Sequence, residues 1–121
     1  MRALIVDDSK TMRMILGKYL RELGFETAEA ADGRQAMDRL YSGERFGLAL
    51  VDWNMPVMDG YEFLRTVRAN ALLGDIRIMM VTTQISMANV RQALAAGADE
   101  YLMKPFTKEL LLEKLALLGL N

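Results

Sequence analysis

The sequence predicts an α/β fold, a doubly wound parallel sheet with helices on both of its faces. Three observations support this prediction. Short apolar runs alternate with longer stretches of helical periodicity through all 121 residues, as in repeated strand–helix units. Three of the runs are continuously or almost continuously apolar, which is typical of strands buried on both faces. Glycines and capping residues stand between the segments, where turns and helix ends require them.

Two strand–helix units open the chain. An apolar strand at 3–6 precedes Ser9, a candidate N-cap for a helix that Gly24 ends. Segment 26–31 alternates polar and small residues, which favours an exposed edge strand, and a second helix begins at Asp32. Apolar residues at helical spacing predict the inner faces of both helices. They are Met12, Ile15, Leu16, Tyr19, Leu20 and Leu23 in the first, and Ala36, Met37, Leu40 and Tyr41 in the second.

Three further units follow, with short and largely apolar strands predicted at 48–51, 76–81 and 101–103. Each strand is followed by a helix with an apolar inner face. These helices are one led by Asp59 and Gly60 with Phe63, Leu64 and Val67, one opened by Ser86 with Met87, Val90 and Leu94, and one capped by Thr107 with Leu111, Leu115 and Leu118.

Five such units form one domain over residues 1–121. The first, third and fourth strands are apolar enough to be central, whereas the second and fifth are mixed and suit the edges. The flavodoxin-like strand order 2-1-3-4-5 satisfies this sorting. In that order the ligand crevice opens between the first and third strands, at their carboxyl ends.

Polar residues follow four of the strands directly at this edge: Asp7, Asp8, Asp52, Thr82 and Lys104. Three carboxylates gathered there would repel one another by about 4 kcal/mol per pair at an effective dielectric constant near 20. Mg²⁺, which takes oxygen ligands, and the Lys104 ammonium are the natural counter-charges. Together with the Thr82 hydroxyl they can neutralise a transferring phosphoryl group. Asp52, at the tip of a central strand, is then the predicted nucleophile.

Each of these residues alone has an ordinary structural explanation. Asp7 or Asp8 can cap a helix, and Lys104 can be a solvated surface lysine. Thr82 can simply end a strand, and Trp53 can pack within its loop. The ten methionines are explained as core filler. Their coincidence at one edge of the sheet is what favours a single phosphoryl-transfer site.

The composition excludes several classes of function. Fifteen basic residues against sixteen acidic ones leave no electrostatic footprint for nucleic acid or an anionic membrane. Without His, the chain has no Ser-His-Asp relay, no imidazole metal ligand and no phosphohistidine of its own. The absence of Cys fits a cytoplasmic protein. No apolar stretch approaches the roughly 20 residues of a membrane span, and nothing in the N-terminal run directs export.

The motif residues together resemble the receiver domain of two-component response regulators, above all those of the single-domain chemotaxis type. The motifs are Val-Asp-Asp-Ser at 6–9, Thr-Met-Arg at 11–13, Asp-Trp-Asn-Met-Pro at 52–56, Met-Asp-Gly at 58–60, Val-Thr at 81–82 and Lys-Pro-Phe-Thr at 104–107. The resemblance covers essentially the whole chain, in order and at the expected spacing. It implies a phosphorylation-controlled signalling protein rather than an enzyme acting on other substrates.

The resemblance also implies a role for each residue of the metal and phosphoryl site. Asp52 would accept a phosphoryl group from the phosphohistidine of a sensor histidine kinase. Asp8, Asp52 and the backbone carbonyl of Asn54 would ligate Mg²⁺, with Asp7 helping through water. Lys104 would contact the phosphoryl oxygens, and its bond to Pro105 would be cis.

A switch and its partners are implied in the same way. Thr82 and Tyr101 would form a switch pair that alters the surface made by the fourth helix, fifth strand and fifth helix. A downstream target, such as the flagellar motor switch, and a phosphatase would be further partners. Thr83, Gln84, Ser86 and Met87 depart from the chemotaxis pattern. Because of these departures, three questions stay open: how accessible the site is, how long the phosphoryl group lasts, and whether the flagellar motor switch is the target.

Four alternatives remain. A phosphatase or phosphotransferase of the haloacid dehalogenase type carries an acid two residues after its nucleophile, where this chain has Asn54. A flavin or nucleotide binder would need a glycine-rich phosphate loop, which the sequence lacks. An adaptor that is never phosphorylated would not need every catalytic position filled. The chain can also be a receiver cut from a longer regulator, although an initiating Met and a complete last helix favour a stand-alone protein.

Overall fold

The structure is a computed structural model that describes residues 1–73, 75–83 and 87–120. Its strands are β1 (Arg2–Val6), β2 (Glu26–Ala30), β3 (Leu48–Asp52), β4 (Arg77–Thr82) and β5 (Glu100–Met103). Its helices are α1 (Lys10–Glu22), α2 (Gly33–Tyr41), α3 (Gly60–Ala69), α4 (Met87–Ala95) and α5 (Lys108–Leu117), with a short 3-10 helix, η1, at Ala71–Leu73. None of the described helices is both long and apolar enough to cross a membrane.

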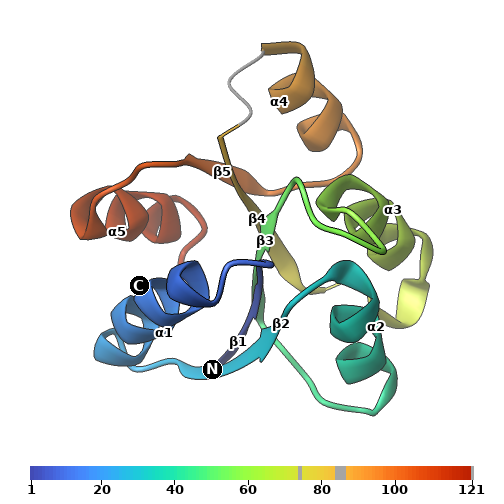
Figure 1. Ribbon diagram of the computed structural model, residues 1–121, viewed down its shortest axis with the longest axis horizontal. Coiled ribbons are helices and arrows are strands. Elements are labelled where there is room, and N and C mark those ends of the chain that lie inside the picture. Colours follow the sequence, from blue (N-terminus) through green and yellow to red (C-terminus); the bar gives the residue numbers. More distant parts are fainter. Residues whose placement is uncertain (74, 84–86, 121) are drawn as a thin grey trace.

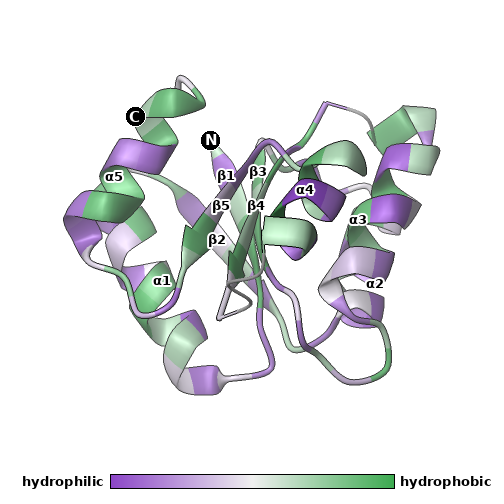
Figure 2. Ribbon diagram, turned by 90° about the horizontal axis from the view of Figure 1, so that it is seen from above, coloured by the Kyte–Doolittle hydropathy of each residue, from purple (hydrophilic) through white to green (hydrophobic). Residues whose placement is uncertain are grey.

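The strands form one parallel sheet in the order β2-β1-β3-β4-β5. Helices α1 and α5 cover one face of the sheet, and α2, α3 and α4 cover the other (Figure 1). Figure 2 shows the hydrophobic strands between these two layers of helices. The predicted doubly wound fold and its strand order are therefore confirmed.

Alternate residues of the central strands supply two separate cores. In β1, Ala3 and Ile5 pack with residues of α1 and α5, whereas Leu4 and Val6 pack with residues of α2 and α3. All four side chains are completely buried. Because both faces of such a strand are covered, its sequence is apolar without alternation. This burial on both faces fixes where the carboxyl ends of β1 and β3 lie.

Side-chain caps define where four of the helices begin. In each, an oxygen of the residue before the helix accepts a hydrogen bond from a backbone N–H of the first turn, which that turn cannot satisfy internally. The pairs are Ser9 with Met12, Asp32 with Gln35, Asp59 with Glu62, and Thr107 with Leu110. The predicted opening of the fourth helix at Ser86 lies outside the described residues.

Four residues predicted to face inward face solvent instead. Their exposed fractions are 38% for Ile15, 62% for Tyr41, 64% for Met87 and 45% for Leu94. Ile15 directly precedes the buried Leu16 and Tyr41 directly follows the buried Leu40, so both lie at the margin of their helix's apolar stripe. In α4 the only buried residue is Ala93, because this helix lies beside the short edge strand β5 and meets the sheet through a narrow strip.

Arg68, near the end of α3, ties that helix to the segments around β4 and β5. It donates hydrogen bonds to the carbonyls of Gly97 and Ile76, at 2.9 and 2.8 Å, and to the Asp99 carboxylate at 2.8 Å. Asp99 also accepts from the backbone N–H of Ile78 at 2.8 Å. The guanidinium therefore holds the amino-terminal edge of the sheet, away from the predicted site.

Arg68→Met is expected to lower the free energy of unfolding by about 2–3 kcal/mol, because hydrogen bonds from a charged, half-buried group are lost. Chemical denaturation measures the change. Arg65→Met, on the exposed side of the same helix, is the matched control and should change stability by less than about 0.5 kcal/mol. Equal effects of the two substitutions would contradict this role of Arg68.

Candidate functional site

The carboxyl ends of β1 and β3 are adjacent, as the strand order requires. Val6 is paired with Val51 in the sheet, so Asp7 and Asp52 follow on neighbouring strands. Asp7, Asp8 and Asp52 each place a carboxylate oxygen within 4.8 Å of the other two. The structure thus brings together the three acidic residues that the sequence analysis selected.

Asp7 is held by several interactions within the protein. Its side chain is 1% exposed. One carboxylate oxygen accepts from the backbone N–H of Ser9 at 2.8 Å, and the other accepts from Lys104 Nζ at 2.8 Å. Its own N–H donates to the Ala30 carbonyl at 3.1 Å, extending the pairing with β2. These contacts fix the direction in which the next residue, Asp8, leaves the sheet.

Lys104 reaches the carboxylates from the loop between β5 and α5. Its ammonium lies 2.8 Å from Asp7 Oδ2 and 3.6 Å from Asp52 Oδ1. The Lys104 N–H donates to the Thr82 carbonyl at 2.9 Å, and its bond to Pro105 is cis, as the resemblance implied. The Lys104 ammonium therefore lies between the two buried carboxylates.

The environment of Asp52 disfavours its charged form. Burial raises the pKa of the Asp52 carboxyl above its ordinary value, and the charges of Asp7 and Asp8 raise it further. The Lys104 ammonium and the backbone N–H of Trp53 oppose this shift in pKa. Since the shift in pKa remains upward, Lys104 and the Trp53 N–H together do not fully offset burial and the two neighbouring charges. More positive charge at this pocket would stabilise the ionised protein.

The donor set fits a hard divalent cation. All of the side-chain donors are carboxylate oxygens, and those of Asp8 lie on an exposed residue at the mouth of the pocket. Mg²⁺ takes such ligands and keeps several waters. Asn54, whose backbone carbonyl is the further predicted ligand, lies in the exposed loop after β3.

Two glycines determine the course of that loop. Gly60 donates from its N–H to the Trp53 carbonyl at 2.9 Å, and Gly33 donates to the Met58 carbonyl at 3.1 Å. A Cβ at Gly60 would lie 2.1 Å from the Asp52 carbonyl oxygen. Gly60 was expected at a helix start and within the Met-Asp-Gly motif at 58–60, but its close approach to the Asp52 carbonyl was not predicted. The glycine directly after a capping aspartate was the available signal.

Thr82 and Tyr101 lie on neighbouring strands, with Thr82 buried at the end of β4 and Tyr101 half-buried in β5. Both line a small cavity with Trp53 and residues of α4. The Lys114 ammonium lies 4.4 Å from the centre of the Tyr101 ring and 3.3 Å from Glu100. The predicted switch residues are thus close in space. Gln84, one of the positions that leave the phosphoryl lifetime open, lies outside the described residues.

Comparison with known proteins agrees with this fold. The family described as response regulator receiver domain matches residues 3–116. The chain therefore belongs to the response regulator receiver domain family, whose members act in phosphorylation-dependent signalling rather than as classical enzymes.

Among individual proteins, the chain is similar to the chemotaxis protein CheY of Pseudomonas aeruginosa, with 46% identity over 95% of this chain and 93% of that one. The structure resembles that of the Vibrio cholerae chemotaxis protein CheY4, with a TM-score of 0.87 and 38% identity over 95% of both chains. It also resembles a probable two-component response regulator/GGDEF domain protein, with a TM-score of 0.89 and 28% identity, covering 98% of this chain and 49% of that one.

Asp8→Asn is expected to raise the free energy of unfolding in the presence of a chelator by about 1–2 kcal/mol, because it removes repulsion from an exposed member of the cluster. It should also abolish the stabilisation that Mg²⁺ gives the wild type. Thermal denaturation with and without MgCl₂ measures both effects. Asp38→Asn, at an exposed position of α2, is the control. An Asp8→Asn protein that Mg²⁺ still stabilises fully would contradict the assignment of Asp8 as a ligand.

Proposed function

We propose that this chain is a phosphorylation-activated response regulator of a chemotaxis-type two-component system in the cytoplasm. Asp52 accepts a phosphoryl group from the phosphohistidine of a sensor histidine kinase. The observation that carries this proposal is the position of Asp52 at the tip of β3, with Lys104 Nζ 3.6 Å from its carboxylate and two further carboxylates beside it. In this proposal residues 1–121 form one receiver domain.

The transfer is a single displacement at phosphorus. A carboxylate oxygen of Asp52 attacks, the bond between phosphorus and the imidazole nitrogen breaks, and its electron pair returns to the imidazole of the kinase. The Lys104 ammonium, which lies between Asp7 and Asp52, then contacts the phosphoryl oxygens and stabilises their negative charge. Asp8, Asp52 and the Asn54 carbonyl would hold Mg²⁺, with Asp7 acting through water. The bound ion would supply the positive charge that the acidic cluster lacks.

The proposed output is a switch in Thr82 and Tyr101. The phosphoryl group adds a charge of about −1.5 to −2 beside β4. Thr82 turns its hydroxyl toward that group, and the Tyr101 ring moves into the space that Thr82 leaves. The surface of α4, β5 and α5 then changes, and the exposed side chains of Met87 and Leu94 on α4 provide apolar contact for a downstream partner.

We expect the ring NMR signals of Tyr101 to shift when the protein is phosphorylated, because the ring changes its surroundings. The signals of Tyr41, an exposed tyrosine on α2, serve as the internal reference. Tyr101 signals that stay unchanged in fully phosphorylated protein would contradict the switch while leaving phosphoryl transfer intact.

A direct test of the proposed function uses MgCl₂, phosphoramidate and intact-mass measurement. We expect a gain of one phosphoryl group per chain that requires Mg²⁺, reacts with hydroxylamine as an acyl phosphate does, and maps to Asp52 after reduction with borohydride. Multiple turnovers of a phosphorylated substrate would instead favour a phosphatase or phosphotransferase. A flavin retained through purification would favour a cofactor-binding protein.

The downstream partner is a target protein that recognises the phosphorylated form, with a flagellar motor switch protein as the chemotaxis-type candidate and a phosphatase as the protein that ends the signal. The similarity to CheY proteins supports the chemotaxis assignment. Binding of the phosphorylated chain, but not the unmodified one, to a motor switch protein would test it.

A further inference from the structure

We propose that Arg13 is a positioning residue for the acidic pocket and that it holds the corner between β1 and α1 in the geometry that binds a divalent cation. This proposal rests on the proposed function, because it concerns the same pocket. Arg13 belongs to the Thr-Met-Arg motif at 11–13, to which the phosphoryl-transfer mechanism gives no task.

Arg13 contacts the pocket through the backbone of Asp7. Its Nη1 donates to the Asp7 carbonyl oxygen at 2.6 Å, and its Nε donates to Glu29 Oε1 at 2.9 Å. The Arg13 side chain is 15% exposed. Because the Asp7 carbonyl belongs to the peptide that leads into Asp8, the guanidinium fixes the orientation of that peptide.

The position of Arg13 in α1 favours this interpretation. The residue lies one turn into a helix that has no acidic residue in its first turn. A cation near a helix N-terminus is disfavoured by the helix dipole. Contacts outside α1 must therefore offset this cost, and the contacts with Asp7 and Glu29 do so.

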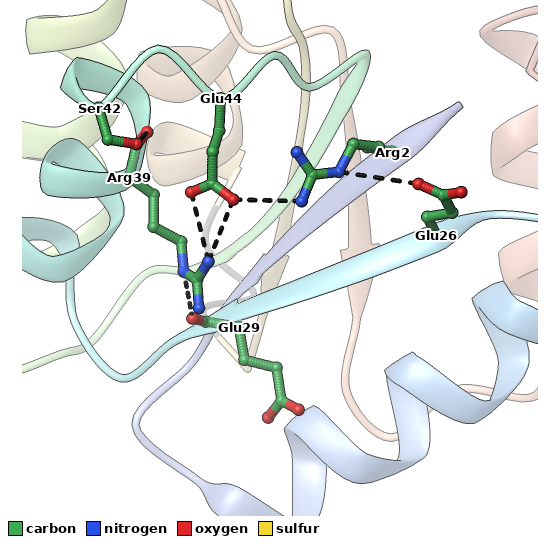
Figure 3. A network of polar contacts seen from close by, with 6 residues as sticks. All are labelled: Arg2, Glu26, Glu29, Arg39, Ser42 and Glu44. Atoms are coloured by element: carbon green, nitrogen blue, oxygen red, sulfur yellow. Dashed lines mark hydrogen bonds and ion pairs between the residues drawn. The ribbon is translucent and has the colours of Figure 1, made fainter.

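Glu29 is itself held in place on the edge strand β2. Arg39 donates to the Glu29 carbonyl at 2.9 Å and pairs with Glu44, which also pairs with Arg2. Figure 3 shows this network, with the Glu29 carboxylate directed away from Arg39. The carboxylate is thus available to Arg13. One arm of the guanidinium is anchored to β2, and the other orients the corner at Asp7.

A positioning role and a purely electrostatic role predict opposite effects on cation affinity. If Arg13 acted only through its charge, its removal would strengthen Mg²⁺ binding, because a nearby positive charge repels the ion. If it orients the ligands, its removal weakens binding, as loss of groups that orient metal ligands commonly does. Arg13→Lys separates the two, since lysine keeps the charge but lacks the two-armed geometry.

The experiment is a titration of the metal-free 1–121 chain with MgCl₂. Isothermal titration calorimetry measures the binding, at a temperature well below the thermal midpoint of each variant. We expect the Kd for Mg²⁺ to rise about tenfold in Arg13→Met and by a smaller factor in Arg13→Lys and Glu29→Ala. Arg34→Met removes an exposed arginine of α2 that pairs with Asp38, and it should leave the Kd unchanged. Circular dichroism verifies that every variant is folded.

An unchanged or lower Kd in Arg13→Met, or a wild-type Kd in Arg13→Lys, overturns the positioning role even if the thermal midpoint falls. If the variants show the expected Kd changes and the wild type binds Mg²⁺ but never gains a phosphoryl group, the proposed function alone is overturned. Wild-type protein that binds no Mg²⁺ would overturn both.

Discussion

Asp52→Asn is expected to abolish the Mg²⁺-dependent phosphoryl adduct completely. The amide that replaces the carboxylate is uncharged and is a poor nucleophile toward phosphorus. The volume of the side chain hardly changes, so the fold and the contacts of Asp7 with Lys104 should persist. Intact-mass measurement after incubation with phosphoramidate tests the loss.

Asp59→Asn is the matched control for this substitution. Asp59 is exposed, and its side chain caps α3 by accepting from the Glu62 N–H at 2.8 Å. Asparagine caps helices about as well as aspartate, so this variant should be phosphorylated like the wild type. An adduct of the same lability in Asp52→Asn would contradict the assignment of Asp52 as the phosphoacceptor.

Asp52→Asn should also stabilise the metal-free protein at neutral pH. The pKa of Asp52 in the folded state lies above its ordinary value, so the fold disfavours the ionised carboxylate. This cost is present above the folded-state pKa and disappears as the pH falls through it and the carboxyl is protonated. The advantage of Asp52→Asn in denaturation experiments with a chelator should therefore be present at pH 7 and shrink on acidification.

Gly60→Ala is expected to lower the free energy of unfolding by about 3 kcal/mol or more, the upper range for overpacking in a rigid site. The new Cβ would lie 2.1 Å from the Asp52 carbonyl oxygen and 2.9 Å from its carbonyl carbon. The atoms it would meet belong to the backbone of the central strand, so relief of the overlap would displace Asp52, the proposed phosphoacceptor. Phosphorylation should therefore be slowed along with the loss of stability.

Gly17→Ala is the control, because Gly17 is also a buried helical glycine. A Cβ there would meet the guanidinium end of Arg21 at 2.8 Å, and that flexible side chain can move. Alanine also favours the helix by about 0.5–1 kcal/mol over glycine. Chemical denaturation of both variants distinguishes the two positions. A Gly60→Ala protein as stable as Gly17→Ala would contradict the proposed steric restriction.

The sequence predicted the sheet because the burial of a strand is visible in the composition of its own few residues. A strand covered on both faces must be apolar throughout, and this distinguished the central strands from the edge strands before any contact was known. Ser9 and Thr107 were identified as caps for a similar reason, since a cap and its partner are three residues apart. The candidate cluster followed from the strand order, which brings the residues after each strand to one edge.

The orientation of α4 was not predictable in this way. Met87 and Leu94 have helical spacing, but whether a spaced pair faces a core depends on how much sheet lies beneath the helix. Beside the edge strand β5, Ala93 is the one residue of α4 that is buried. Exposure of the two larger side chains is therefore a consequence of tertiary structure.

The sequence by itself determined the strands, their order and the set of polar residues at the crevice, because each depends on local patterns of burial and capping. Only the tertiary structure decided that Lys104 lies closer to Asp7 than to Asp52, that Gly60 touches the Asp52 backbone, and that Arg13 reaches the Asp7 carbonyl. Lys104 and Asp7 are 97 positions apart. Distances between such residues are set by the packing of whole elements, which no local pattern specifies.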